Sequence, residues 1–396
     1  MPEREMPLPT VLGPRGRTFG EEERAAVLRV LDSAVLCSAF GSEARSLEAE
    51  MTRLYSRGAR GSGPSRPSRP SRPSRGETVA CSSGTAALHL AVAAAGVGPG
   101  DEVITTPLSD FGTVAPVVAQ GGRVVFADVR PDDGNLDPGA VEAALTSRTK
   151  AVIAVHLFGA AADIDALRAI CDRHGLVLIE DCAQAWLGED STGRLLGTVG
   201  DIACFSLQQY KHITAGDGGL ALTDDPGLAR HMRLFMDKGW DRTEGRIHRE
   251  MGLNYRMTEL TAAVARAQLA KVADVVRVRR ERAGQLVAAL AGLDRVTVPE
   301  PLPGHAWWLF PLLVDDNSRW AKDLQAEGVP TMPGYLERPL YANPALPGYP
   351  PGLCPQAEQL IGRTLLALPW NEGYTEADVE YIARAIRTVH DRAHAR

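Results

Sequence analysis

The sequence predicts an α/β protein with two parts: a large domain, in which helices cover both faces of a mostly parallel sheet, and a smaller C-terminal α/β domain. Two patterns support this fold class. From residue 77 onward, short apolar runs rich in β-branched residues alternate with amphipathic helical patterns, which is typical of parallel sheets. A helical pattern over 257–293, almost free of Gly and Pro, then leads into the C-terminal part. We expect residues 1–250 to form the large domain, and residues 251–396 the long linking helix and the small domain.

Each element is assigned from the length of its apolar run and the polar residues that bound it. The expected strands of the large domain are 78–81, 102–105, 124–128, 151–156, 177–180, 202–206 and 219–223. Helices are expected from Thr85, near Thr113, after Pro138 and over 164–173. In the small domain we expect a strand over 307–314, a helix over 318–327, and a last helix capped by Thr375 with Asp378 three residues further on.

The composition indicates which class of protein this is and in which cell compartment we expect it. The 396 residues are 44% hydrophobic and 23% charged, with a net charge of -6, which is typical of an ordinary globular protein and unlike a basic nucleic-acid binder. No apolar run reaches the ~20 residues of a membrane helix, and the first 20 residues lack a signal-peptide core. We therefore expect a cytoplasmic protein with neither a membrane nor a nucleic-acid partner. The six cysteines stand singly, without ligand-like spacing, so no metal site or disulfide framework is expected.

One low-complexity loop, 58–76, interrupts the large domain. It repeats Ser-Arg-Pro over 65–73 and contains no acidic residue. Proline removes backbone donors and the arginines repel one another, so we expect a solvated loop. An arm for RNA or an acidic partner is the alternative, which the acidic remainder of the chain disfavours.

Ligands of parallel sheets bind at the carboxyl ends of the strands, so polar residues after each apolar run are the candidates for a site. Ser82 to Thr85 form a small polar turn that leads into a helix. Unobstructed amide groups and a hydroxyl at a helix start suit a phosphate, and a simple helix cap explains them equally well. No P-loop or dinucleotide-binding motif is present.

Two charged residues and a serine also follow predicted strands. Asp181 ends a buried run, where it needs a cationic partner or serves as a cap or a structural ion pair. Ser206 and Lys211 follow the run 202–207 and precede the Gly-rich turn 216–219. Lysines are usually solvated, but a sequestered one is readily deprotonated, as a Schiff-base former must be. A phosphate cradle, an aspartate and a lysine together fit pyridoxal phosphate, which needs all three.

The order and spacing of seven motifs resemble the DegT/DnrJ/EryC1/StrS family of sugar aminotransferases, which have the aspartate-aminotransferase-like fold (fold type I). The resemblance runs from about Leu31 to the C-terminus and is interrupted by the Ser-Arg-Pro loop. The motifs are SSGTAAL (82–88), GVGPGDEVIT (96–105), VHLFG (155–159), IEDCAQA (179–185), GDIACFSLQQYK (200–211), GDGG (216–219) and NYRMTEL (254–260). The resemblance implies that the large domain binds pyridoxal phosphate.

The resemblance also implies a role for each matching residue. Lys211 is expected to form the Schiff base and to shuttle the proton, and Asp181 to pair with the pyridinium nitrogen. Gln184 is expected beside the cofactor ring. The expected phosphate-binding residues are Gly84, Thr85 and Ser206, joined by Asn254 from the neighbouring subunit of a homodimer.

Three positions leave alternatives open. The family places an aromatic residue against the cofactor ring, and either Asp110 or Phe111 matches that position. We favour Phe111, because a flat apolar face suits a flat ring. His156 and Trp186 follow strand ends, where they either pack or contact substrate.

The activity implied by the resemblance is transfer of an amino group from L-glutamate or L-glutamine to a keto-sugar or keto-cyclitol, in antibiotic or other secondary-metabolite amino-sugar biosynthesis. A pyridoxal-phosphate-dependent sugar dehydratase or deoxygenase of the same fold is the first alternative. It is disfavoured because the family's dehydratases carry His where this chain has Lys211. A non-catalytic regulatory homologue is the second alternative, which has no need of a buried Lys and Asp pair.

Overall fold

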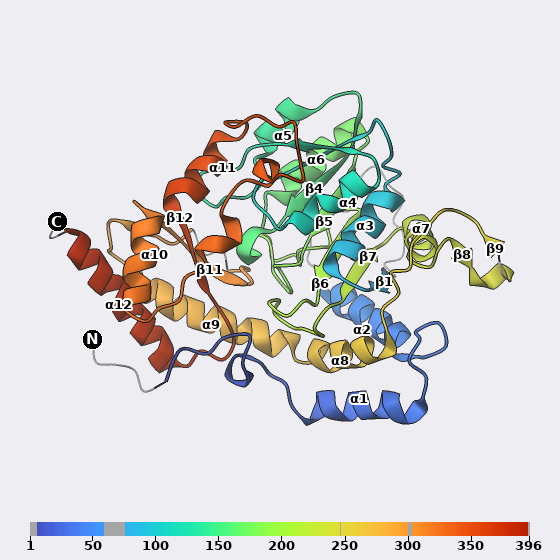
Figure 1. The fold of residues 1–396 in the computed structure, drawn as a ribbon, viewed down its shortest axis with the longest axis horizontal. Helices are drawn as coiled ribbons and strands as arrows, with labels where there is room; N and C mark the ends of the chain where they lie inside the picture. The colour runs from blue at the N-terminus through green and yellow to red at the C-terminus, as the bar shows by residue number, and fades with distance from the viewer. Residues whose placement is uncertain (1–5, 59–75, 246, 300–302, 395–396) are drawn as a thin grey trace.

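The computed structural model describes residues 6–58, 76–245, 247–299 and 303–394 (Figure 1). Its large domain is built on a seven-stranded sheet in the order β1-β7-β6-β5-β4-β2-β3. The strands are β1 (Glu77–Cys81), β2 (Glu102–Thr105), β3 (Arg123–Phe126), β4 (Thr149–Val155), β5 (Val177–Asp181), β6 (Ile202–Ser206) and β7 (Gly219–Thr223). Only β7 runs against its neighbours, β1 and β6. The mostly parallel sheet that the sequence predicts is therefore confirmed.

Helices cover both faces of this sheet, because successive strand residues point to opposite sides. Val103 packs into the cluster under α3 (Gly84–Ala94) and α7 (Pro226–Met236), whereas Ile104 packs on the opposite face with α6 (Ile164–His174). That opposite face is also covered by α2 (Glu43–Gly58). The remaining elements of this part are α1 (Glu21–Ser33), α4 (Ala115–Ala119), α5 (Pro138–Ala144), and a hairpin of β8 (Trp240–Asp241) and β9 (Ile247–His248).

The predicted linking helix consists of two helices, α8 (Glu259–Leu269) and α9 (Val272–Leu290). They meet at Lys271, whose ammonium lies 2.8 Å from the carbonyl oxygen of Thr18 and 2.8 Å from a carboxylate oxygen of Glu23. These contacts with the N-terminal segment come from far along the sequence, so the local pattern does not show the break. The domain boundary drawn after residue 250 stays a prediction.

The small domain has a three-stranded antiparallel sheet, in the order β10-β11-β12, and its own core. Its elements are β10 (Val296–Thr297), β11 (Leu309–Val314), α10 (Asn317–Ala326), α11 (Pro355–Gln359), β12 (Leu365–Pro369) and α12 (Glu376–His394). The predicted cap of α12 is confirmed: the amide of Asp378 donates to the hydroxyl of Thr375 at 3.2 Å, and the amide of Thr375 donates to the Asp378 carboxylate at 2.8 Å.

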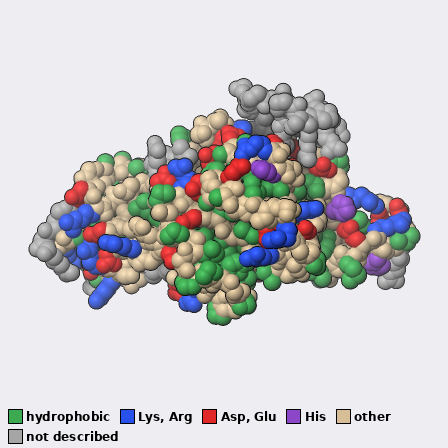
Figure 2. All heavy atoms as spheres, turned by 90° about the horizontal axis from the view of Figure 1, so that it is seen from above, with side chains coloured by type: hydrophobic (Ala, Val, Ile, Leu, Met, Phe, Trp, Pro, Cys, Tyr) green, Lys and Arg blue, Asp and Glu red, His purple; other side chains and the backbone are tan. Residues whose placement is uncertain are grey.

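The surface is charged, and most of the cysteines lie inside the protein. Acidic and basic side chains are interspersed over the face drawn in Figure 2. All six cysteines are free, and five of them are buried. Among the described residues, the structure contains no helix with the length and apolarity needed to cross a membrane. The Ser-Arg-Pro repeat at 65–73 lies outside the described residues.

Candidate active site

A cavity of about 350 Å³ opens at the carboxyl ends of β1, β5 and β6. It forms there because parallel strands end at one edge of the sheet, where the loops that follow them converge. Of the residues assigned to a site from the sequence, this cavity brings together Gly84, Thr85, Asp181, Ser206 and Lys211.

Lys211 follows β6 on a short turn, and its side chain is 9% exposed. Its ammonium nitrogen lies 4.2 Å from the centre of the ring of Trp308, which the small domain contributes just before β11. Burial lowers the pKa of Lys211, and the nearby carboxylates of Asp181 and Asp110 oppose that shift. The cavity therefore contains an amine that releases its proton more easily than a solvated lysine does.

Asp181 is the last residue of β5 and is buried. The hydroxyl of Thr113 donates to its Oδ2 at 3.0 Å, and the amide of Ala183 donates to its Oδ1 at 3.2 Å. Burial raises the pKa of Asp181, whereas these donors and Lys211 hold it down. The carboxylate is thus fixed in direction by two hydrogen bonds, and a protonated ring nitrogen in the cavity would stabilise its charge.

The turn between β1 and α3 is shaped for close approach of a ligand. Ser83 caps α3 by accepting from the amide of Ala86 at 3.0 Å, and the next two residues, Gly84 and Thr85, line the cavity at the start of the helix. A Cβ atom on Gly84 would lie 2.7 Å from Cβ of Ser206, so a side chain has no room there. The hydroxyls of Thr85 and Ser206 complete a set of donors that suits a phosphate.

Gln184 lies on the loop that follows β5, one residue beyond Ala183, which lines the cavity. Its Oε1 accepts from the amide of Phe158 at 2.7 Å, and its Nε2 donates to the hydroxyl of Tyr335 at 2.8 Å. Both ends of the amide are therefore held, and Gln184 meets the cavity through Tyr335, which is one of the lining residues.

Asp110, Gly112 and Thr113 line the cavity, whereas Phe111 is partly buried and packs against the large hydrophobic core. Asp110 caps a short helix at Phe111–Thr113 by accepting from the amide of Gly112 at 2.8 Å. The assignment of Phe111 to the cofactor ring stays a prediction, with Asp110 as the alternative.

Asn254 is the predicted site residue that lies apart from the cavity. It is exposed on the loop before α8, and its backbone pairs with that of Asp237. Within one chain it therefore does not join the other assigned residues.

His156 and Trp186 both pack inside the protein. Nε2 of His156 lies 3.0 Å from Oε2 of Glu180, and its Nδ1 accepts from the amide of Ala162 at 3.1 Å. Although Glu180, His156 and Cys182 lie close enough to hold a metal ion, both imidazole nitrogens already have partners. The indole of Trp186 donates to the carbonyl of Ser206 at 3.1 Å, which supports the site from behind.

The sequence did not reveal what the C-terminal half contributes to this cavity. Trp308 falls within the strand predicted over 307–314, and no element is predicted for residues 332–335. Trp308, Met332 and Tyr335 all line the cavity. No local pattern marks such residues, because they reach the site only when the two domains pack together.

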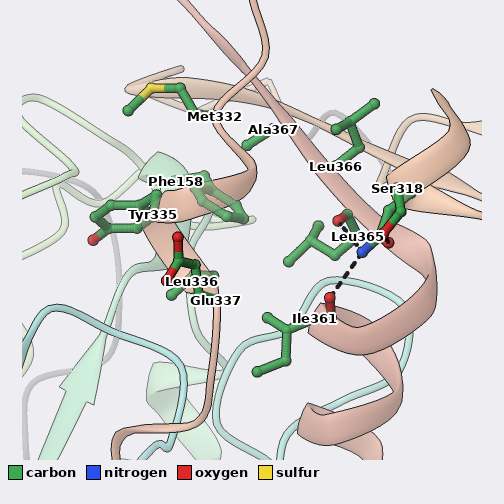
Figure 3. Close-up of a pocket in the computed structure, with 11 residues that line it drawn as sticks. Phe158, Ser318, Met332, Tyr335, Leu336, Glu337, Ile361, Leu365, Leu366 and Ala367 are labelled. Atoms are coloured by element: carbon green, nitrogen blue, oxygen red, sulfur yellow. Dashed lines mark hydrogen bonds between the residues drawn. The ribbon is translucent and has the colours of Figure 1, made fainter. Parts of the chain in front are cut away.

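A second cavity of about 210 Å³ adjoins the first and shares Met332 and Tyr335 with it. Figure 3 shows the ring of Tyr335 beside Phe158 on one side of this cavity, with Ile361 and Leu365 on the other. The ring of Tyr335 also packs edge-on against Trp308, with 4.9 Å between the ring centres. Tyr335 therefore forms part of the wall between the two cavities.

Comparisons with known proteins agree with this fold. GDP-perosamine synthase of Caulobacter vibrioides is 37% identical over 322 residues, covering 78% of this chain and 85% of that protein. L-Glutamine:2-deoxy-scyllo-inosose aminotransferase of Streptomyces kanamyceticus is 39% identical over 323 residues, covering 74% and 73%. The crystal structure of S. venezuelae DesV in complex with a ketimine intermediate matches with a TM-score of 0.83 and 33% identity, covering 94% of this chain and 95% of that one.

A model of the DegT/DnrJ/EryC1/StrS aminotransferases matches residues 74–387, most of the chain. The expected fold type I is confirmed by the structural match. The chain therefore belongs to the DegT/DnrJ/EryC1/StrS aminotransferase family.

Proposed function

We propose that the protein uses pyridoxal phosphate to transfer an amino group from L-glutamate or L-glutamine to a keto-sugar or keto-cyclitol in amino-sugar biosynthesis. The observation that carries the proposal is the convergence of Lys211, Asp181 and the α3 phosphate cradle on one cavity. The names of two relatives, a perosamine synthase and a scyllo-inosose aminotransferase that uses L-glutamine, support the substrate class.

The residues of the cavity fit this cofactor. Gly84 leaves space where a Cβ atom would meet Ser206, and the hydroxyls of Thr85 and Ser206 can donate to a phosphate. Asp181 can hold a proton on the pyridine nitrogen, since a buried carboxylate is stabilised by a cation beside it. When bound, pyridoxal phosphate supplies an electron sink for the carbon that carries the amino group.

Lys211 then acts as both the attachment point and the proton carrier. Its lowered pKa favours the neutral amine, which is the form that attacks an aldehyde. The same nitrogen can take the proton from the amino-bearing carbon of the donor in the first half-reaction. In the second half-reaction it can return a proton to the carbon of the ketone that receives the amino group, because the turn holds it inside the cavity. The ring of Trp308 shields it from water on one side.

A homodimer would bring Asn254 to the cavity of the other subunit. Two apolar side chains are strongly exposed in the single chain: Met251, on the loop of Asn254, is 90% exposed, and Phe40, on the segment before α2, is 78% exposed. The segment that contains Phe40 lies beside the start of α8, since the amide of Glu259 donates to the carbonyl of Leu36 at 3.1 Å. A second copy would cover this apolar surface and fix the loop that carries Asn254.

The test is an amination assay with the protein loaded with pyridoxal phosphate. L-Glutamate and L-glutamine, labelled in the transferable nitrogen, are each paired with a panel of keto-sugars and keto-cyclitols. We expect the label in the product with wild-type protein and with Lys322→Ala, an exposed lysine on α10, and no turnover with Lys211→Ala. A product without nitrogen would support the dehydratase alternative, and full turnover by Lys211→Ala would refute the proposal.

A further inference from the structure

Arg17 holds the turn that carries Lys211 through its backbone. The guanidinium donates to the carbonyl of Lys211 at 2.7 Å and to that of His212 at 3.4 Å, and it also bonds the carbonyl of Gln209. Arg17 precedes Lys211 by 194 residues, so the hold depends entirely on the tertiary fold. A planar guanidinium with several fixed N–H groups can satisfy several carbonyls at once, which an ammonium cannot do in the same geometry.

Trp308 completes the hold on the same turn. Its indole nitrogen donates to the carbonyl of Tyr210 at 2.7 Å, while its ring lies under the ammonium of Lys211. The carbonyls of four successive residues, 209 to 212, therefore all accept hydrogen bonds from side chains outside the turn. The backbone on either side of the reactive lysine has little freedom to rotate.

The charge of Arg17 is buried and only partly balanced. The residue is 9% exposed, and the carboxylate of Glu372 lies 3.8 Å from its guanidinium. Glu372 is shared with Arg279, which lies closer to it, at 2.8 Å. Burial lowers the pKa of Arg17 to about 10, against the opposing effect of Glu372. Two buried cations thus share one anion, and the carbonyl dipoles of the lysine turn stabilise the rest of the charge.

Arg17 stands on a segment, residues 6–20, that we call the N-terminal strap. The strap contacts both the small domain and the lysine turn. The side-chain amide of Asn371 donates to the carbonyl of Pro9 at 3.0 Å, and that of Gln209 donates to the carbonyl of Val11 at 2.7 Å. The strap therefore connects the small domain to the turn that presents Lys211.

We propose that Arg17 is a positioning residue: it fixes the backbone of the turn 208–212, so that the amine of Lys211 stays above Trp308 and near Asp181. Through the strap, this position is linked to the packing of the small domain. The catalytic meaning of the inference rests on the proposed function, whereas the hold on the turn is a property of the protein itself.

The test compares Arg17→Met with Arg15→Ala by amide hydrogen exchange, in protein with and without pyridoxal phosphate. Arg15 is the matched control, because it lies on the same strap, is exposed, and its guanidinium donates to the carbonyl of Pro7 within the strap. In Arg17→Met we expect the rate of amide exchange in 207–215 to rise by about tenfold or more, whereas the rate in β4 should not change. In Arg15→Ala both regions should exchange as in the wild type.

Kinetics distinguish positioning from a purely structural role. Arg17→Met should lower kcat by about tenfold or more while KM for the amino donor changes little, because the lysine moves and the substrate contacts remain. It should also shift the pH at which the visible absorption band of the loaded cofactor changes. Wild-type exchange in 207–215 together with a wild-type kcat would overturn the proposal.

Arg17→Lys keeps the test decisive if Arg17→Met does not fold. This variant retains the buried charge but loses the planar fork, so we expect a folded protein with faster amide exchange in 207–215 and a lower kcat than wild type. Wild-type behaviour of Arg17→Lys in both measurements would overturn the proposal. If the wild-type protein shows no aminotransferase activity but the turn loosens in the Arg17 variants, the proposed function fails and the hold of Arg17 on the turn stands.

Discussion

At Gly84 the phosphate cradle has no room for a side chain. Gly84→Ala places a methyl group 2.7 Å from Cβ and 2.9 Å from Oγ of Ser206, which is anchored in the buried strand β6. We expect a loss of about 1–3 kcal/mol in the free energy of unfolding from the forced shift. The dissociation constant for pyridoxal phosphate should rise by about tenfold or more, since the cradle must open. Thermal melting and titration of the cofactor into unloaded protein measure the two effects.

Gly98→Ala is the control, because a Cβ atom on Gly98 meets no other atom within 4 Å. It should leave both quantities within error of the wild type. Equal cofactor affinity in the two variants would mean that the ligand does not approach the turn at Gly84.

Asp181→Asn tests the carboxylate at the end of β5. The amide can still accept from the hydroxyl of Thr113, so the fold should persist, but it cannot hold a proton on the cofactor nitrogen. We expect kcat to fall by about 10²–10⁴-fold, the range of a lost acid–base contribution. Steady-state turnover at saturating donor and acceptor measures this.

The same variant should stabilise the protein when no cofactor is bound. Burial raises the pKa of Asp181, so in unloaded wild-type protein the stability linked to its protonated form is lost as the pH rises through that pKa. Asparagine does not titrate. The melting temperature of unloaded Asp181→Asn should therefore exceed that of wild type at neutral pH, and the difference should shrink in acid. A wild-type protein that melts higher at neutral pH would contradict this account.

Residues that follow strands could be found from the sequence, and residues brought in by packing could not. Asp181, Ser206 and Lys211 stand just after apolar runs, and the ends of parallel strands meet at one edge of the sheet. Trp308 comes from the small domain and Arg17 from the N-terminal strap. Their neighbours in sequence are unremarkable, since each touches the site only through contacts made far along the chain.

At the scale of single elements, α9 contains a glycine that the fold does not require. Gly284 lies inside the helix, is exposed, and has no atom within 4 Å of the position of a Cβ atom. Gly284→Ala should raise the free energy of unfolding by about 0.5–1 kcal/mol, because alanine loses less backbone entropy in a helix. Chemical denaturation measures the change, and turnover should be unaffected. A destabilised variant would show that the helix needs flexibility at this position.

Element boundaries were predictable where apolar runs were short and bounded by polar residues. The strands 102–105, 202–206 and 219–223 agree with the structure to the residue. β12 was missed because its apolar run, 365–368, has no periodicity that separates a strand from a helix. The helices α1 and α2 were also not predicted. No glycine or proline marks the break between α8 and α9. Contacts of Lys271 with the N-terminal segment, which lies far away in the sequence, accompany the break.

At the scale of the whole molecule, the proposed dimer predicts complementation between inactive subunits. If Asn254 serves the partner's cavity, Lys211→Ala and Asn254→Ala place their defects in different sites of a mixed dimer. One site then combines an intact Lys211 with an intact Asn254, and the other carries both defects. Activity should return toward one working site per mixed dimer, measured by the amination assay after subunit exchange.

A matched mixture with Lys211→Ala and Asp181→Asn should show no such recovery beyond the residual activity of the parents, because both residues serve the cavity of their own chain. If subunit exchange is demonstrated and Asn254→Ala alone is inactive, a mixture that stays inactive would mean that Asn254 acts within its own chain.

The most direct measurement is the identity of the lysine that binds the cofactor. The sequence has five lysines, Lys150, Lys211, Lys238, Lys271 and Lys322, and only Lys211 is buried. Borohydride reduction of the protein loaded with pyridoxal phosphate, followed by peptide mass spectrometry, reveals which of them carries the cofactor. The account predicts near-complete modification of Lys211 and none of the others at one cofactor per chain. Modification of another lysine, or of none, would contradict it.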